Sequence, residues 1–195
     1  MKCDCRDSSL GFKNWALLQE VACRAVNGDE NGFAGVPEAP GVYCIRVRHL
    51  VEADPTKIIK NYCRSPLYKA FQTLDKASAS FFDGCKFGQG WGWGYPTMEE
   101  VGNRIRQIGR FSVTASGKVR CPILYIGRSN NLRTRAGQLI SWAHTVNQPL
   151  WALLFSEWTL EIAFRRSNDE KKAENRLKSA FRKKHGGMLP PLMTK

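Results

Sequence analysis

The feature that most constrains this chain is the stretch from Pro122 to Leu139, whose two halves follow different periodicities. Its first half, residues 123–126, is a short apolar run with β-branched and aromatic residues, which is typical of a buried strand. Gly127 ends the run, and Asn130 is a favourable N-cap for a helix that begins just after it. Apolar residues then recur at a spacing that lines one face of a helix: Leu132, Ala136, Leu139, Ile140 and Ala143. The stretch therefore predicts a buried strand followed at once by a helix.

Three arginines lie at the corner between this strand and this helix. Arg128, Arg133 and Arg135 fall in the turn or in the first helical turns. Cations at a helix N-terminus oppose the helix dipole, so this placement costs a little stability. A bound anion would relieve that cost, and a phosphate is the natural candidate. The alternative is that Arg128 and Arg135 are ordinary solvated surface charges.

This corner resembles the second half of the signature of the GIY-YIG nucleases. Tyr125-Ile126-Gly127, the basic residue Arg128, Asn131-Leu132 and Arg135 match that half at fixed spacing. Gly41-Val42-Tyr43 resembles the first half and lies in a strand-like stretch after a Pro-containing turn. The resemblance implies a small domain that hydrolyses phosphodiester bonds of nucleic acid.

The predicted elements follow the order of the core that the resemblance implies. In chain order they are strands at 41–48 and 123–126, helices at 132–143 and 150–155, a strand at 160–166, and a helix capped by residue 168 or 169 and ending at 184. On the first strand, residues 43, 45 and 47 are expected on one face and residues 42 and 44 on the other. We therefore predict the α/β class (layered α+β), with a small three-stranded sheet flanked by helices in a single domain over residues 1–195.

The resemblance covers residues 36–50 and 119–195 and leaves two segments outside it. Residues 1–35 are predicted to form an N-terminal helical extension, because the apolar residues between 13 and 27 follow a helical spacing. Residues 51–118 are an insertion between two strands that family members usually join by a short hairpin. We expect this insertion to pack on the core and to choose the substrate.

The insertion carries secondary-structure signals of its own. A helix is predicted at residues 65–82, and a capping box at 97–100 opens a second helix that Gly109 ends. Residues 111–120 resemble a hairpin arm.

Between these helices, residues 86–96 (KFGQGWGWGYP) are rich in glycine and aromatic residues. As a binding loop, this segment would stack Trp91, Trp93 or Tyr95 on nucleic-acid bases or wedge one of them into a groove. As a turn-rich connection, it would use the same side chains to cap the core, and we favour this second interpretation.

The net charge of the chain is +13 and is unevenly distributed. Residues 1–40 hold four basic and six acidic residues, so residues 41–195 carry a net charge of +15. A basic excess confined to the part that contains the motif indicates a polyanionic partner, for which duplex DNA is the first candidate. The alternative is a basic surface without a specific partner.

The cysteines and the apolar runs indicate a soluble intracellular protein. Seven cysteines occur without a CxxC pair, so we do not expect a zinc ribbon or finger, and free thiols of a reducing compartment are favoured. The sequence has no signal-peptide pattern and no apolar run near 18 residues. We therefore predict a cytoplasmic location and no membrane partner.

The resemblance implies a role for each of five residues. Tyr43 matches the tyrosine thought to take a proton from water, with Arg128 as the nearby cation that favours the phenolate. Tyr125 matches the tyrosine that contacts the phosphate or orients water, and Arg135 matches an arginine that binds phosphate oxygens. Glu174 matches the single acid that binds the divalent metal, Mg²⁺ or Mn²⁺. The expected nucleic-acid contacts are Arg128, Arg133, Arg135, Trp91 and Trp93.

Ordinary structural interpretations exist for the same residues. Both tyrosines would be half-buried core residues, and Glu174 would be an i,i+4 partner of Lys178 on an exposed helix face. Glu170, one turn earlier, is the rival for the metal.

Two positions depart from the family pattern. Leu139 stands where many members carry His or Tyr, and Met193 stands where many carry Asn. His144 is not an obvious substitute, and His49 and His185 have weak support. We therefore predict a DNA endonuclease of restriction, defence or repair type. The alternatives are a nucleic-acid-binding module that lost turnover and an RNA-directed nuclease.

Overall fold

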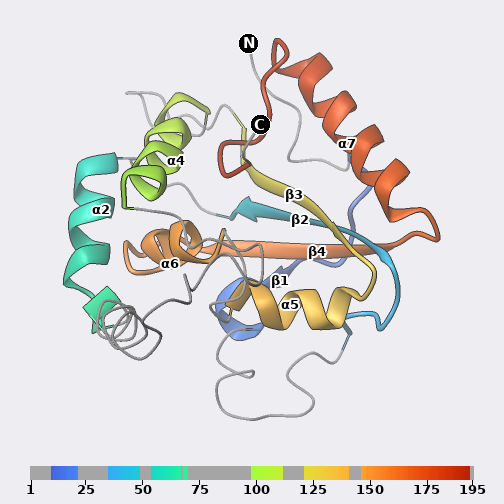
Figure 1. The fold of residues 1–195 in the computed structure, drawn as a ribbon, viewed down its shortest axis with the longest axis horizontal. Helices are drawn as coiled ribbons and strands as arrows, with labels where there is room; N and C mark the ends of the chain where they lie inside the picture. The colour runs from blue at the N-terminus through green and yellow to red at the C-terminus, as the bar shows by residue number, and fades with distance from the viewer. Residues whose placement is uncertain are drawn as a thin grey trace, which may run out of the picture.

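The structure is a computed structural model that describes residues 10–21, 35–48, 54–66, 68–69, 98–111, 121–140 and 146–193. Within these residues, strands form one antiparallel sheet with helices on both of its faces (Figure 1). The strands are β1 (Ala16–Leu17), β2 (Gly41–Val47), β3 (Ile123–Ser129) and β4 (Leu160–Arg166), in the order β1-β4-β2-β3. The helices are α2 (Pro55–Arg64), α4 (Met98–Phe111), α5 (Leu132–Ile140), α6 (Asn147–Leu154) and α7 (Glu170–Lys184).

The three strands predicted from periodicity are present and lie side by side. β2 is the central strand, and its Tyr43 pairs with Gly127 of β3 on one side and with Phe164 of β4 on the other. The layered α+β class is therefore confirmed.

The prediction of three strands is wrong by one. Residues 16 and 17 form β1, which pairs with Ile162 and Glu161 of β4. Helical backbone begins only at residue 18 and is described as far as residue 21, so the prediction of a helix from residue 13 is wrong for its first turn. The open edge of β4 offers backbone groups that an extended chain can pair with. This tertiary pairing outweighs a weak local helical preference.

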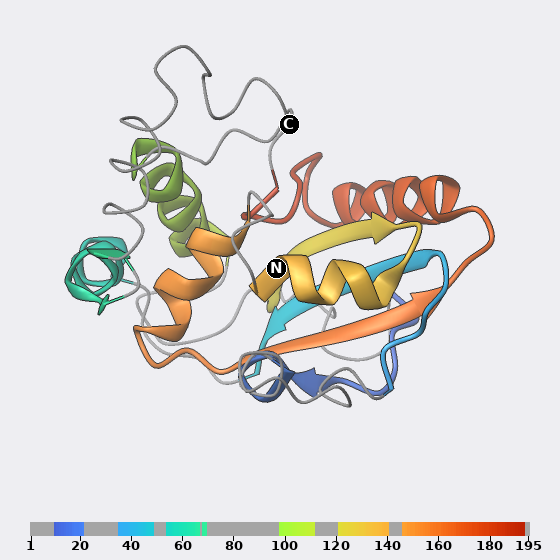
Figure 2. The same ribbon diagram turned by 60° about the horizontal axis from the view of Figure 1, so that its bottom comes forward.

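The predicted alternation of side chains along β2 is confirmed by the two hydrophobic cores. Tyr43, Ile45 and Val47 belong to the larger core, to which α2, α4, α5 and α6 contribute. Val42 and Cys44 belong to the second core, which α7 covers on the opposite face of the sheet (Figure 2). The sheet is thus buried on both faces.

A β-bulge in β3 determines which of its residues lie on the same face of the sheet as Tyr43 of β2. The register of β2 against β3 shifts after Ile45, and Leu124 is the extra residue. Leu124 and Tyr125 therefore both face the larger core, where Tyr43 also lies. Beyond the bulge the ordinary alternation resumes, so Arg128 faces the α7 side.

The N-cap of α5 lies one residue later than predicted. Oδ1 of Asn131 accepts a hydrogen bond from the backbone N–H of Thr134 at 3.0 Å, and the helix begins at Leu132. Asn130 is therefore not the cap. The hydroxyl of Ser129 fixes the turn, because it donates to the carbonyl of Asn131 and accepts from the N–H of the same residue.

Helix α7 has the predicted ends. Asp169 caps it by accepting a hydrogen bond from the N–H of Lys172 at 2.8 Å, and the helix ends at Lys184. Neither α7 nor any other helix of the described ranges is long and apolar enough to cross a bilayer.

The predictions for the insertion are confirmed only in part. Helix α2 was not predicted, and Ser65, where a helix was expected to start, is its C-cap, although residues 66, 68 and 69 are again helical. Helix α4 corresponds to the predicted second helix but continues past Gly109 to Phe111. Residues 70–97 and 112–120, which include Trp91, Trp93 and most of the predicted hairpin arm, lie outside the described residues.

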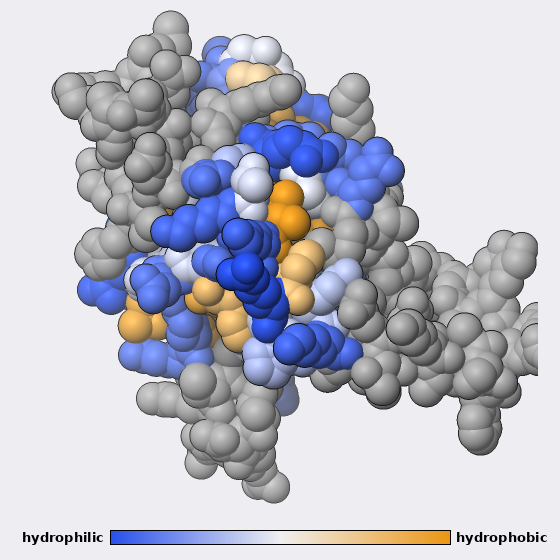
Figure 3. Space-filling model, turned by 90° about the vertical axis from the view of Figure 1, so that its left-hand side faces the viewer, coloured by the Kyte–Doolittle hydropathy of each residue, from blue (hydrophilic) through white to orange (hydrophobic). Residues whose placement is uncertain are grey.

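Helix α2 has clear local signals in its sequence. Oδ1 of Asp54 accepts from the N–H groups of Thr56 and Lys57, and a proline opens the helix. Ile58 and Tyr62 are buried against the core, and on the side of the molecule seen in Figure 3 hydrophilic residues predominate, with smaller apolar patches between them. The outer face of α2 carries exposed Lys57, Lys60 and Arg64.

Candidate active site

Two tyrosines meet on one face of the sheet. Tyr43 of β2 lies opposite Gly127 of β3, and the rings of Tyr43 and Tyr125 stack with their centroids 5.8 Å apart. Their hydroxyl groups share a hydrogen bond. A Cβ atom at position 127 would overlap the ring and the hydroxyl of Tyr43. The glycine of the motif is therefore explained by the space that this ring occupies.

Burial makes Tyr43 a poor proton acceptor. The residue is 1% exposed, and desolvation is the main cause that raises its pKa well above the ordinary value. The charge of Arg135 lowers the pKa of Tyr43 but does not offset the burial. We expected Arg128 to be the cation that favours the phenolate of Tyr43. In the structure, the arginine whose charge lowers the pKa of Tyr43 is Arg135. Neutral Tyr43 is better suited to hold Tyr125 than to take a proton from water.

Tyr125 is the more accessible tyrosine of the pair. It is partly buried, and burial raises its pKa. The hydrogen bond with Tyr43 raises the pKa of Tyr43 and lowers that of Tyr125, as expected when Tyr43 donates and Tyr125 accepts. The charge of Glu174 raises the pKa of Tyr125, while those of Arg135 and Arg104 lower it. Of the pair, Tyr125 is therefore the tyrosine that keeps some solvent-exposed surface.

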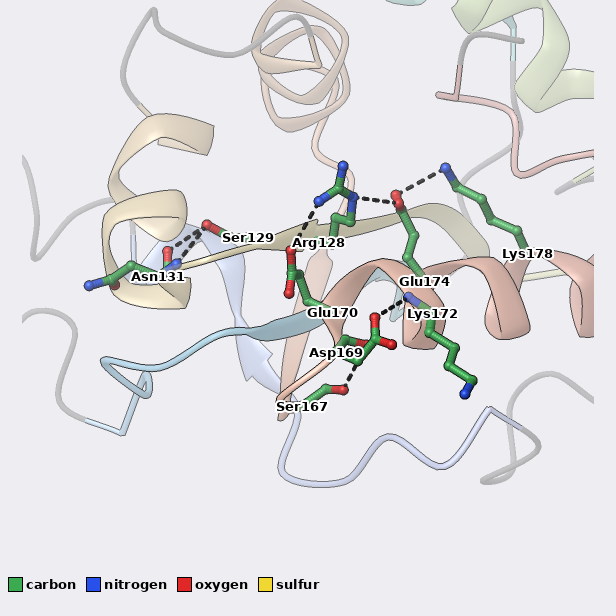
Figure 4. Close-up of polar contacts among 9 residues, drawn as sticks. All are labelled: Arg128, Ser129, Asn131, Ser167, Asp169, Glu170, Lys172, Glu174 and Lys178. Atoms are coloured by element: carbon green, nitrogen blue, oxygen red, sulfur yellow. Dashed lines mark hydrogen bonds and ion pairs between the residues drawn. The ribbon is translucent and has the colours of Figure 1, made fainter.

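An ion-pair cluster lies on the other side of β3, against α7 (Figure 4). Arg128 donates from Nη1 to Oε1 of Glu170 and from Nε to Oε2 of Glu174, each at 3.1 Å. Nζ of Lys178 lies 3.0 Å from Oε1 of Glu174. The Glu174 side chain is only 12% exposed, so both of its oxygens face cations more than bulk water. Two carboxylates and two cations leave the cluster without net charge.

Arg133 and Arg135 have different surroundings although both belong to α5. The charge of Arg135 lowers the pKa of both tyrosines, which places it beside the pair. Arg133 instead donates from Nη1 to Glu38 at 2.8 Å and from Nε to the carbonyl of Val36 at 3.2 Å. It therefore ties the loop before β2 to α5. The structure places the predicted site residues Tyr43, Tyr125 and Arg135 together on the α5 side of the sheet, and Arg128 and Glu174 together on its α7 side.

An arginine of the insertion lies near enough to this site for its charge to act on Tyr125, and the sequence reasoning missed it. Arg104 of α4 is 8% exposed and lies on the same helix face as Val101, Ile105 and Ile108, which are fully buried. Its charge lowers the pKa of Tyr125. A cation on the apolar face of an amphipathic helix is the signal that could have found it, because arginine is rarely buried without a reason.

The two departures from the family pattern are packing residues in this chain. Leu139 is 2% exposed in the larger core, and its carbonyl accepts a hydrogen bond from the side chain of Asn147 at 2.9 Å. Met193 packs against the second core. Of the histidines considered as substitutes, His185 is the one within the described residues. Its ring stacks on Phe181 at the end of α7.

The donor set at the edge of the sheet suits a metal held by few protein ligands. No three His, Cys, Asp or Glu side chains of the described residues form a metal cluster. Each oxygen of Glu174 makes one ion pair and retains a further lone pair. A single carboxylate supplemented by water and phosphate oxygens is an environment that Mg²⁺ accepts. Because the cluster is electrically neutral, a dication would be held weakly until a phosphate adds negative charge.

Family models, characterised proteins and solved structures all fail to match this chain at a significant level. The resemblance to GIY-YIG nucleases therefore rests on the matched residues alone. The case for a site rests on the geometry of the tyrosine pair and its charged neighbours.

Proposed function

We propose that the chain is a divalent-metal-dependent endonuclease that hydrolyses phosphodiester bonds of duplex DNA. The observation that carries the proposal is the stacked pair of Tyr43 and Tyr125. The charges of Arg135 and Glu174 shift the pKa values of both tyrosines. Phosphodiester hydrolysis needs an oriented water, positive charge at the phosphate and a ligand for a metal. The groups around this pair can supply all three.

Each residue has a role that follows from its position. Tyr125 orients the attacking water or contacts a phosphate oxygen, and the hydrogen bond from Tyr43 holds its hydroxyl in place. Arg135 and Arg104 bind the phosphate oxygens, and their attraction grows as negative charge develops. Glu174 would hold Mg²⁺ or Mn²⁺, which when bound neutralises charge on the phosphate.

Charge and thiol chemistry support an intracellular partner with many phosphates. The net charge of +15 on residues 41–195 favours a polyanion. The described Cys63 is a free thiol, in keeping with a reducing compartment.

The test compares Glu174→Gln with Glu170→Gln, because both carboxylates contact Arg128. Cleavage of supercoiled, branched and single-stranded DNA, and of RNA, is measured with and without Mg²⁺. We expect Glu174→Gln to abolish cleavage while DNA binding persists, and Glu170→Gln to remain active. Cleavage by Glu174→Gln within about tenfold of wild type, about 1.4 kcal/mol, would exclude it as the metal ligand. If cleavage were lost in Glu170→Gln but not in Glu174→Gln, Glu170 would be the metal ligand instead.

A nucleic-acid-binding module without turnover is the second candidate. It is favoured by the two ion pairs that engage both oxygens of Glu174, and by the burial that keeps Tyr43 neutral. With this function, Arg135→Ala would weaken DNA binding and no cleavage would be seen in any variant. A nuclease would instead lose turnover more than affinity in the same variant.

A further inference from the structure

Helix α7 separates its charges onto two sides. Its sequence, EKKAENRLKSAFRKK, has seven basic and two acidic residues. Both acidic side chains, Glu170 and Glu174, turn to Arg128 on β3. The exposed positions of α7 therefore carry cations without an acidic residue among them.

The burial pattern shows how α7 is turned relative to the candidate site. Glu174, Leu177 and Phe181 are buried toward the sheet. Residues four, three and four positions apart line up along a helix. One such line runs beside Glu174 on its solvent side. We call it the basic row, and its members are Lys171, Asn175, Lys178 and Arg182.

The two ends of the basic row have no acidic partner in the described part of the chain. Lys171 and Arg182 are exposed and take part in no ion pair there, whereas Lys178 is bound to Glu174. Lys171 also lies in the first turn of the helix, where a cation opposes the dipole. Helix stability therefore does not explain this lysine, while an anionic partner would.

We propose that the basic row binds the backbone phosphates next to the reacting phosphate of duplex DNA, an inference that rests on the proposed nuclease function. Lys171 and Arg182 are about 17 Å apart along the helix axis. Duplex DNA carries a negative charge about every 1.7 Å of its axis, so several phosphates fit against this length. Lys178 joins the row to the carboxylate of Glu174 at 3.0 Å (Figure 4), which makes the row continuous with the site.

The test measures DNA affinity against salt concentration for Lys171→Gln/Arg182→Gln in metal-free buffer. The probe is a 20-base-pair duplex of random sequence, and binding is followed by fluorescence anisotropy. Lys57→Gln/Lys60→Gln is the matched control, because it removes the same charge from the exposed face of α2, far from α7 in both ribbon views. All four side chains are solvent-exposed, so folding should be unaffected.

In a plot of log K against the logarithm of salt concentration, we expect the line for the α7 double variant to be less steep than that for wild type by about 1.8, or about 0.9 for each lost phosphate contact. The α2 control should change the slope much less. An unchanged slope in the α7 variant, or an equal change in both variants, overturns the inference. If wild type still cleaves in either case, the proposed function survives. If wild-type protein shows no salt-dependent binding, both the proposed function and the inference fail.

Discussion

Replacing Gly127 by alanine should displace the tyrosine pair and destabilise the protein. The added Cβ would overlap Cζ and Oη of Tyr43 and would lie 2.7 Å from Cε1 of Tyr125. The Tyr43 ring has little room to move, because it is 1% exposed and also packs against the ring of Phe164. Gly127 does not have a positive φ, so alanine suits the backbone and the cost is steric.

We expect the free energy of unfolding to fall by about 1–3 kcal/mol, the usual cost of overpacking a core. Urea unfolding followed by far-UV circular dichroism measures it. Gly102→Ala in α4 is the matched control, since the nearest neighbour of its added methyl would be Cδ1 of Ile59 at 3.4 Å. Alanine inside a helix is better than glycine by about 0.5–1 kcal/mol. The same substitution should therefore have opposite signs at the two positions.

A double-mutant cycle shows whether the Tyr43 ring is the cause. Tyr43→Leu removes both the Cζ and the Oη atoms that the new methyl would overlap, so Gly127→Ala should cost less stability in this background than in wild type. A coupling of at least about 0.5 kcal/mol is expected for residues in contact. A Gly127→Ala protein as stable as wild type would contradict the steric explanation, as would strictly additive effects of the two changes.

Two further predictions concern residues outside the sequence motif. Arg104→Met should slow single-turnover cleavage by on the order of a hundredfold with a smaller loss of affinity, as when one charge-stabilising donor is removed. Wild-type turnover in a folded Arg104→Met protein would leave Arg104 with a packing role only. Burial raises the pKa of Tyr62 well above its ordinary value, so its contribution to stability is present below pH 10 and is lost as the pH rises above 10. In wild type the free energy of unfolding should therefore fall as the pH rises from 9 to 11.5. In Tyr62→Phe this fall should be smaller by up to about 1.4 kcal/mol per pH unit. Urea unfolding at several pH values measures it, and the same pH dependence in both proteins would count against the prediction.

The core of the fold was predictable because its strands carry strong local patterns. Residues 41–47 alternate between two buried faces, and residues 160–166 do the same over most of their length. Strand β1 was not predictable, because a two-residue strand is defined by the partner it pairs with and not by its own sequence. The choice between Asn130 and Asn131 as helix cap also depends on the turn that Ser129 fixes. Boundaries of this kind follow from tertiary geometry.

The partners of the site residues were harder to predict than their identities. Adjacency in the motif suggested that Arg128 lies beside Tyr43. Because side chains alternate along β3, Arg128 points to the face opposite Tyr125, where α7 presents two carboxylates. Arg104 could not be connected to the tyrosines from the sequence, since a long insertion gives no spacing to count. The structure makes that connection through the packing of α4 on the larger core.

In the proposed function, the position of β3 at the edge of the described sheet would let groups on two faces act on one phosphate. Tyr125 lies on the α5 side of this strand and Arg128 on the α7 side, so only one strand separates them. The charge of Glu174, which is held on the α7 side, still raises the pKa of both tyrosines. A central strand would have neighbours along both edges and could not present both faces to the same ligand. The N–H of Leu192 donates to the carbonyl of Leu124 on this edge at 3.0 Å, so in the proposed function a phosphate would approach β3 beyond that contact, with the tyrosines on one side and the carboxylate on the other.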